Sequence, residues 1–380
     1  MGILNGFTNG TKTASNGASS SMDAQSLRAV LENVIDPDLH QTLGTLSAIH
    51  NVEVEGDTVR VYLLLHAPLH FAAERINTAC KEAIHKVFPQ AKGEIFVQEK
   101  LAERPANRPL ANVKHLIAVA SGKGGVGKST ISANLAAALA RKGAVVGLID
   151  ADIHGPSVPT MFDLEEEELR GTKNEQGQFI GHPMEKYGVK LVSMGFVMGR
   201  DQAAIMRGPM QAGYLNTFIE QIAWGELDYL LFDLPPGTGD IQLTMAQRVP
   251  LTGAVIVTTP QNLALADVRR GISMFNRVNI PTLGVIENMS YYVLPDGSRD
   301  YIFGQGGGEK IAKEMNAPFL GEVPLNINVR KGGDEGLPVV LNDHAPMQQR
   351  AIMELAEKLA SEIRRRGAQG QQVPTVQIAI

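Results

Sequence analysis

The chain has 380 residues and a formal net charge of -5, with 35 basic and 40 acidic residues. This length predicts two domains, and the slightly acidic balance excludes a global positive field that would hold nucleic acid or a membrane surface. No segment approaches the roughly 20 apolar residues of a membrane helix. The sequence holds one cysteine, Cys80, so an intrachain disulfide is excluded and a cytoplasmic location is expected.

The first quarter of the chain predicts a tail and a small α+β domain. Residues 1–21 are rich in Gly, Ser, Asn and Thr and should form a disordered tail. In residues 22–97, two helical patterns flank strand-like runs at 48–54 and 58–64, which are joined by a hairpin turn. Cys80 lies on the apolar face of the second helix, where a cysteine is more often a core residue than a ligand.

A linker and a larger domain follow. Residues 98–111 contain prolines and charges without an apolar period, which indicates a linker. Residues 112–366 alternate buried strand-like runs with helical patterns, which predicts a mostly parallel sheet flanked by helices. A final helix over 349–366 ends in three arginines, which we expect to serve the helix dipole and solubility, and residues 367–380 should form a flexible tail. The strand-like runs are 116–120, 144–149, 229–232, 254–257 and 282–286.

A glycine-rich segment follows the first strand of the larger domain. Gly122-Lys123-Gly124-Gly125-Val126-Gly127-Lys128-Ser129 matches the pattern G-x-x-x-x-G-K-[ST] between a strand and a helix. Backbone N–H groups of such a loop bind phosphate oxygens, helped by the dipole of the next helix. Lys128 should contact the β and γ phosphates, Ser129 should ligate Mg²⁺, and Thr130 should bond a phosphate further back. The larger domain is therefore predicted to be an α/β P-loop NTPase that binds ATP and Mg²⁺.

Charged residues around this loop complete the predicted site. Lys123 is a second lysine inside the loop and suggests a further phosphate contact. Asp150, Asp152 and Asp233 follow two strands, and carboxylates at the carboxyl ends of parallel strands face the ligand crevice. One of them can hold Mg²⁺ while another orients or deprotonates the attacking water. Each aspartate by itself could be a helix cap.

Taken together, these motifs resemble the Mrp type of iron-sulfur cluster carrier ATPases, a deviant Walker A family related to the partition, division-site and nitrogenase iron-protein ATPases. The resemblance implies an ATP-hydrolysing homodimer that delivers clusters to apoproteins, assisted by assembly proteins. It implies that Lys123 reaches the partner subunit's nucleotide, that Asp152 activates water beside the Mg²⁺ ligands Asp150 and Asp233, and that Asn288 reads adenine. The small N-terminal domain resembles a companion domain of the family. The resembling segments are 123–129, 150–157, 207–209, 224–240, 258–261, 287–290 and 302–304.

One departure from the family concerns the cluster itself. Cluster-carrying members have a C-x-x-C pair just after the segment 287–290, whereas this chain has Leu294 and Gly297 at those positions. Neither can replace a thiolate ligand, so no residue of this chain is predicted to be a cluster ligand. His66 and His70 are four apart, but Pro68 between them makes a shared helical face and a metal site improbable.

Two other functions compete with the carrier. An ATP-gated scaffold or positioning protein would need a basic DNA-binding face or an amphipathic membrane helix, and the sequence supports neither. A redox role like that of the nitrogenase iron protein is disfavoured because the cluster cysteines are absent. The carrier remains the leading prediction.

Overall fold

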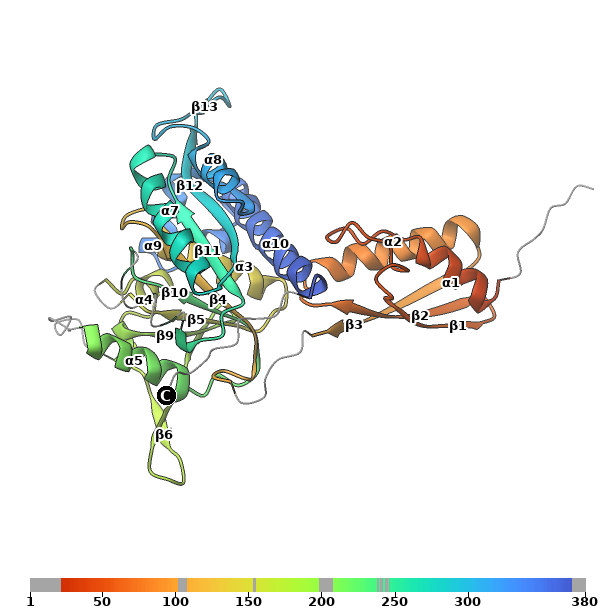
Figure 1. Ribbon diagram of the computed structural model, residues 1–380, viewed down its shortest axis with the longest axis horizontal. Helices are drawn as coiled ribbons and strands as arrows, with labels where there is room; N and C mark the ends of the chain where they lie inside the picture. The colour runs from red at the N-terminus through yellow and green to blue at the C-terminus, as the bar shows by residue number, and fades with distance from the viewer. Residues whose placement is uncertain are drawn as a thin grey trace, which may run out of the picture. The chain divides into compact units, whose positions relative to one another are not determined.

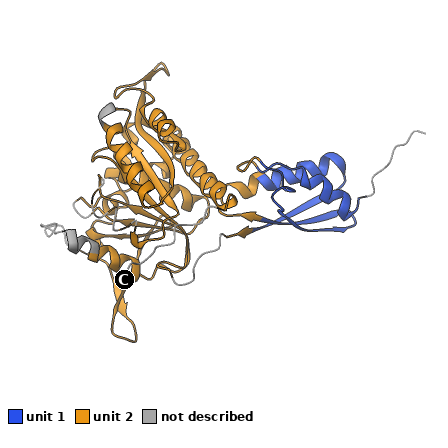
Figure 2. Cartoon of the chain, in the orientation of Figure 1, with its two compact units in different colours: residues 1–36, 41–64, 76–98 blue, residues 37–40, 65–75, 99–380 orange. Residues whose placement is uncertain are grey.

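The computed structural model describes residues 22–101, 108–152, 155–197, 208–237, 239, 242, 245 and 247–370. The expected tail 1–21, most of the expected C-terminal tail (371–380), residues 102–107 of the expected linker, and parts of three resembling segments (153–154, 207, 238 and 240) lie outside the described residues. The chain divides into two compact units (Figure 2). Unit 1 comprises residues 1–36, 41–64 and 76–98, and unit 2 comprises residues 37–40, 65–75 and 99–380.

A three-stranded sheet with the order β1-β2-β3 forms the centre of the N-terminal region, together with two helices. The predicted hairpin is present, because β1 pairs antiparallel with β2 and Gly56 turns between them with a φ of 60°. Strand β3 was not predicted, although its residues alternate between half-buried and exposed as a one-sided strand should. Cys80 on α2 is fully buried, which confirms it as a core residue. The elements are α1 (Ala24–Glu32), β1 (Ile49–Glu55), β2 (Thr58–His66), α2 (Ala72–Val87) and β3 (Lys92–Lys100).

Unit 2 is an α/β fold around a mostly parallel sheet, as predicted (Figure 1). Within the described residues the sheet has nine strands in the order β13-β12-β11-β4-β10-β5-β9-β8, with β14 also paired to β12. Only β8 and β13 pair antiparallel with their neighbours. The strands are β4 (Val113–Ser121), β5 (Val146–Asp150), β8 (Met184–Lys186), β9 (Val189–Ser193), β10 (Leu227–Asp233), β11 (Gly253–Thr258), β12 (Thr282–Val293), β13 (Arg299–Asp300) and β14 (Phe319–Leu325).

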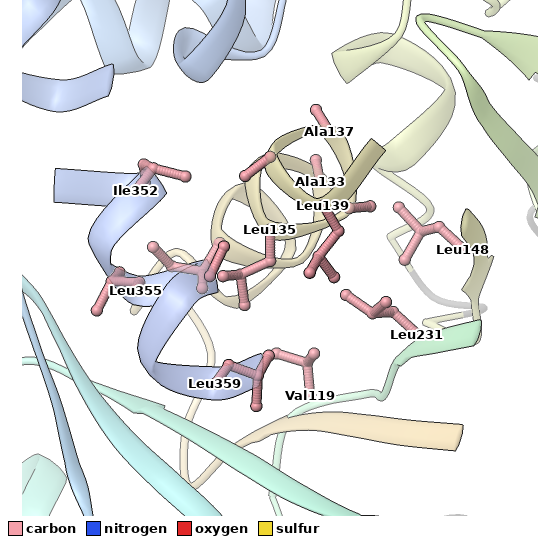
Figure 3. Packing of buried hydrophobic residues seen from close by; sticks show 14 of the residues in the cluster. Val119, Ala133, Leu135, Ala137, Leu139, Leu148, Leu231, Ile352, Leu355 and Leu359 are labelled. Atoms are coloured by element: carbon pink, nitrogen blue, oxygen red, sulfur yellow. The ribbon is translucent and has the colours of Figure 1, made fainter. Parts of the chain in front are cut away.

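Helices cover both faces of this sheet, which explains why the strand sequences lack polar alternation. Successive residues of β4 enter opposite cores: Ile117 belongs to the core that contains residues of α3 and α10, whereas Leu116 belongs to the core that contains residues of α5, α7 and α8. Figure 3 shows part of the first core, in which Leu135 and Leu139 of α3 face the sheet residues Val119 and Leu231 and Leu359 of α10. The helices are α3 (Lys128–Arg141), α4 (Val158–Met161), α5 (Gly208–Glu220), α7 (Asn262–Arg277), α8 (Gly307–Glu314), α9 (Ile327–Asp334) and α10 (Pro346–Ala368).

The remaining described elements of unit 2 are short. A separate two-stranded antiparallel sheet pairs β6 with β7, and two 3-10 turns connect longer elements. No helix among the described residues is both long enough and apolar enough to cross a membrane. The bounds are β6 (Gly171–Lys173), β7 (Phe179–Gly181), η1 (Met194–Phe196) and η3 (Val339–Leu341).

The predicted role of the three closing arginines of α10 is wrong for Arg364. This side chain is fully buried, and its guanidinium bonds Asp38 Oδ2 at 3.1 Å and the carbonyl of His66 at 2.8 Å. Asp38 also bonds Arg75 at 2.6 Å. These bonds explain why residues 37–40 and 65–75 group with unit 2, whereas the predicted domain split was linear at residue 97.

Replacing Arg364 with alanine should therefore destabilise unit 2. The change leaves the buried carboxylate of Asp38 with less charge compensation and opens space in the core, which we expect to lower the free energy of unfolding by about 3 kcal/mol. Arg365→Ala is the matched control, because Arg365 is half exposed and its pair with Glu362 should contribute less than about 1 kcal/mol. Urea unfolding curves measure both values, and equal effects of the two variants would contradict the buried role of Arg364.

Candidate nucleotide site

The predicted phosphate loop joins the end of β4 to the start of α3. Gly125 and Gly127 both have a φ of 79°, a left-handed conformation that glycine adopts without steric cost. Gly127 caps α3 without a side-chain bond, so the first N–H groups of the helix are left for a ligand. The loop therefore has the backbone conformation and the helix N-terminus that a phosphate group needs.

Lys128 and Asp233 form a buried ion pair beneath this loop. Lys128 Nζ lies 2.8 Å from Asp233 Oδ1, and the two side chains are 6% and 0% exposed. The hydroxyl of Ser129 donates to Asp233 Oδ2 at 2.5 Å, and the hydroxyl of Ser132 donates to Asp233 Oδ1 at 2.7 Å. Ser132 was not predicted; it lies one helical turn after Lys128 and so reaches the same carboxylate.

Asp150, another predicted magnesium ligand, lies beside Asp233. Asp150 and Asp233 are paired in register at the carboxyl ends of β5 and β10, and both are fully buried. Burial, together with the negative charge of Asp233, raises the pKa of Asp150. Two buried carboxylates and the hydroxyl of Ser129 are oxygen donors of the kind that Mg²⁺ prefers, and a divalent cation would offset their repulsion. The residues present therefore fit a magnesium ion.

Asp152 lies two residues beyond β5, at the same end of the sheet. Its side chain is half-buried, and its backbone N–H donates to Asp150 Oδ1 at 3.1 Å. This bond ties the position of Asp152 to one of the predicted magnesium ligands. The structure thus brings Asp152, Asp150 and Asp233 to one edge of the sheet, next to the phosphate loop.

Two further predicted residues contact the loop or its surroundings. Lys123 Nζ donates to Gln261 Oε1 at 3.1 Å. Asn288, predicted to read adenine, is 5% exposed and donates to the carbonyl of Val126 at 2.9 Å. In this conformation the amide nitrogen of Asn288 therefore braces the phosphate loop, and its contact with adenine remains a prediction. Gln261 lies in the resembling segment 258–261, and its contact with Lys123 connects it with the site.

The positions of the missing cysteines lie in the turn between β12 and β13. Gly297 N donates to the carbonyl of Leu294 at 2.9 Å, so the two residues are the ends of one tight turn. Gly297 has a φ of 85°, and a Cβ added there would meet nothing within 4 Å. The turn projects from the sheet of unit 2 (Figure 1), so the substituted positions are at an accessible tip.

His66 and His70 each contact another residue of unit 2. His66 ends β2 and its carbonyl accepts from Arg364, whereas His70 Nε2 lies 3.3 Å from Asp228 Oδ2. Burial acts to raise the pKa of Asp228. Hydrogen bonds from His70 and Lys114 nevertheless hold this pKa well below its usual range. No group of three or more His, Cys, Asp or Glu residues that could hold a metal ion was found in the part of the chain that the structure describes.

Comparisons with known proteins agree with this geometry. The family model of NUBPL iron-transfer P-loop NTPases matches residues 112–360, and the model of an iron-sulfur cluster assembly protein matches residues 24–97. An iron-sulfur cluster carrier protein of Synechocystis is 44% identical over 88% of this chain and 96% of its own length. The Escherichia coli K12 protein of the same description is 40% identical over 92% of this chain and 95% of its own.

A solved structure of a nucleotide-binding protein is also similar to this chain. The nucleotide-binding protein of Archaeoglobus fulgidus in complex with ADP is 40% identical, covers 60% of this chain and 88% of its own, and has a TM-score of 0.53. The loop geometry, the buried carboxylates and a family match over more than half of the chain lead to one conclusion. The chain belongs to the NUBPL-type iron-transfer P-loop NTPase family, and its N-terminal region matches the iron-sulfur cluster assembly protein family.

Proposed function

We propose that this protein is an Mg²⁺-dependent ATPase that works as a homodimeric iron-sulfur cluster carrier and delivers clusters to apoproteins. The observation that carries the ATPase is the buried set of Lys128, Ser129 and Asp233 beneath a loop with the phosphate-binding conformation. Relatives named as iron-sulfur cluster carrier proteins align over most of this chain, and they support an iron-sulfur cluster as the cargo. A cytoplasmic location accompanies the proposal, in keeping with the free thiol of Cys80.

The residues of the site divide the work of hydrolysis. The N–H groups of the loop and Lys128 hold the phosphates, and Lys128 exchanges its bond to Asp233 for phosphate oxygens. Ser129, Asp150 and Asp233 would hold the Mg²⁺, which would neutralise charge on the phosphates. Asp152 accepts the proton of the attacking water, and Lys123 stabilises charge that develops during transfer. In this scheme the cluster is a substrate that ATP turnover moves, rather than a resident cofactor.

The variant Asp152→Ala tests this scheme. It should keep ATP binding and dimer closure but lose at least about 100-fold in hydrolysis, because proton transfer to the water is removed. Light scattering coupled to size-exclusion chromatography, with and without ATP, should show a dimer that persists in ATP. Asp152→Asn is the matched variant, since it keeps the size but not the basicity of the side chain, and it should behave in the same way.

The cargo is tested with the same proteins. A purified apoprotein that needs a four-iron cluster is mixed with the protein, iron, sulfide and a small thiol, and its cluster absorbance is followed. Wild-type protein should speed cluster acquisition when ATP is present, and Asp152→Ala should slow it. If wild-type protein never speeds acquisition while its ATP-dependent dimer forms normally, the carrier function is refuted and the ATPase stands.

A further inference from the structure

A glutamine at the start of α7 contacts the extra lysine of the phosphate loop. Lys123 Nζ donates a hydrogen bond to Gln261 Oε1 at 3.1 Å, and both side chains are half-buried. Gln261 lies between β11 and α7 and occupies the N-cap position of that helix with extended backbone. Its side chain makes no capping bond to the helix, so the amide oxygen is left to accept from the lysine.

Backbone packing fixes this acceptor relative to the loop. A Cβ added at Gly122 would lie 2.3 Å from Asp267 Cβ and 2.9 Å from the backbone nitrogen of Val268, so the loop begins in direct contact with α7. A Cβ added at Gly307 would lie 2.4 Å from the carbonyl oxygen of Pro260. Helix α7 is therefore packed against the start of the phosphate loop, and the residue before Gln261 is packed against the start of α8, which leaves Gln261 little freedom to follow a moving lysine.

We propose that Gln261 is a positioning residue that holds Lys123 beside the loop of its own subunit until a phosphate oxygen replaces the amide. The inference rests on the proposed role of Lys123 in hydrolysis. A neutral amide oxygen is a weaker acceptor for an ammonium group than an ionised phosphate. A bound nucleotide can therefore replace Gln261 as the hydrogen-bond partner of Lys123. A carboxylate at position 261 would compete with the phosphate far better. The amide thus sets how readily Lys123 is released.

Two substitutions of Gln261 should change, in opposite directions, how strongly Lys123 is held. Gln261→Glu should lower kcat for ATP hydrolysis about tenfold with KM nearly unchanged, because a charged acceptor holds Lys123 more strongly. Gln261→Leu should raise kcat about threefold, because the resting bond is lost. Both variants are repeated with Lys123→Ala, where neither should change kcat further, since residues that act through one another are not additive. Asn276→Asp, an exposed change of the same charge on α7, is the control and should leave kcat unchanged.

The outcomes distinguish this inference from the proposed function. If Lys123→Ala hydrolyses ATP at the wild-type rate, the role of Lys123 fails and the inference fails with it. If Lys123→Ala is slow but the Gln261 variants change kcat equally with and without Lys123, only the positioning role of Gln261 is overturned. Opposite changes in kcat for Gln261→Glu and Gln261→Leu that vanish in the Lys123→Ala background support the inference.

Discussion

Replacing Lys128 with alanine is expected to weaken ATP binding at least about 100-fold, because charge-assisted bonds to the terminal phosphates have no neutral substitute in this loop. Isothermal titration calorimetry with ATP and Mg²⁺ measures the loss. Affinity equal to that of the wild type would show that the phosphate site is elsewhere.

The buried position of Lys128 adds a second effect that must be separated from binding. Alanine leaves the carboxylate of Asp233 fully buried with only hydroxyl donors, which should lower the free energy of unfolding by about 3–5 kcal/mol. The double variant Lys128→Ala/Asp233→Asn removes both charges. Its amide oxygen can accept from one of the two serine hydroxyls, and its amide nitrogen can donate to the other. The double variant should regain most of the lost stability in thermal unfolding while its ATP affinity stays low.

The double variant separates an effect on binding from an effect on folding. A double variant that is stable and does not bind ATP shows that the lost affinity is not a loss of fold. The single variant Asp233→Asn, which keeps Lys128 but lacks one proposed magnesium ligand, should bind ATP more tightly than the double variant if Lys128 contacts the phosphates directly. A double variant that regains wild-type affinity would mean that Lys128→Ala had only disturbed the fold.

The second large effect concerns the cluster. The purified protein should retain far less than one four-iron cluster per dimer, because such a site needs about four thiolates and a homodimer supplies two, both from Cys80. Burial raises the pKa of the Cys80 thiol to about 12, so at neutral pH it remains protonated and is a poor ligand. The measurement is anaerobic reconstitution with iron and sulfide, desalting, and determination of iron, labile sulfide and visible absorbance per dimer.

Two variants sharpen this experiment. Cys80→Ser should leave the low iron content unchanged. Leu294→Cys/Gly297→Cys restores a C-x-x-C pair at the two ends of one turn, and the space around Gly297 is open, so only the left-handed backbone opposes it at about 1 kcal/mol. This variant should move the retained iron toward one four-iron cluster per dimer.

A full cluster retained by the wild-type protein would contradict this expectation. Wild-type protein that keeps about one four-iron cluster per dimer after desalting, and keeps it in Cys80→Ser, must use ligands other than its cysteines. Low iron with intact ATPase activity and cluster transfer would mean that a partner or a small thiol supplies the missing ligands.

The sequence by itself determined the fold class and predicted most of the candidate nucleotide site. Strand-like runs without polar alternation identified five central strands. A strand covered by helices on both faces has no solvent-exposed side, so its sequence needs no alternating polar residues. The phosphate loop was recognisable because its chemistry lies in a contiguous segment with fixed spacing. Asp150 and Asp233 were found because each ends a predicted strand, and parallel strands bring their carboxyl ends to one edge.

Only the tertiary structure decided which distant groups meet. The contact of Gln261 with Lys123 spans 138 residues of sequence, and no periodicity predicts such a pairing. Arg364 looks like a solvated helix end in the sequence, yet long-range packing buries it against Asp38, where the ion pair compensates for lost hydration. Local patterns report each residue's own helix or strand, whereas the burial of a charge depends on the segments that fold over it.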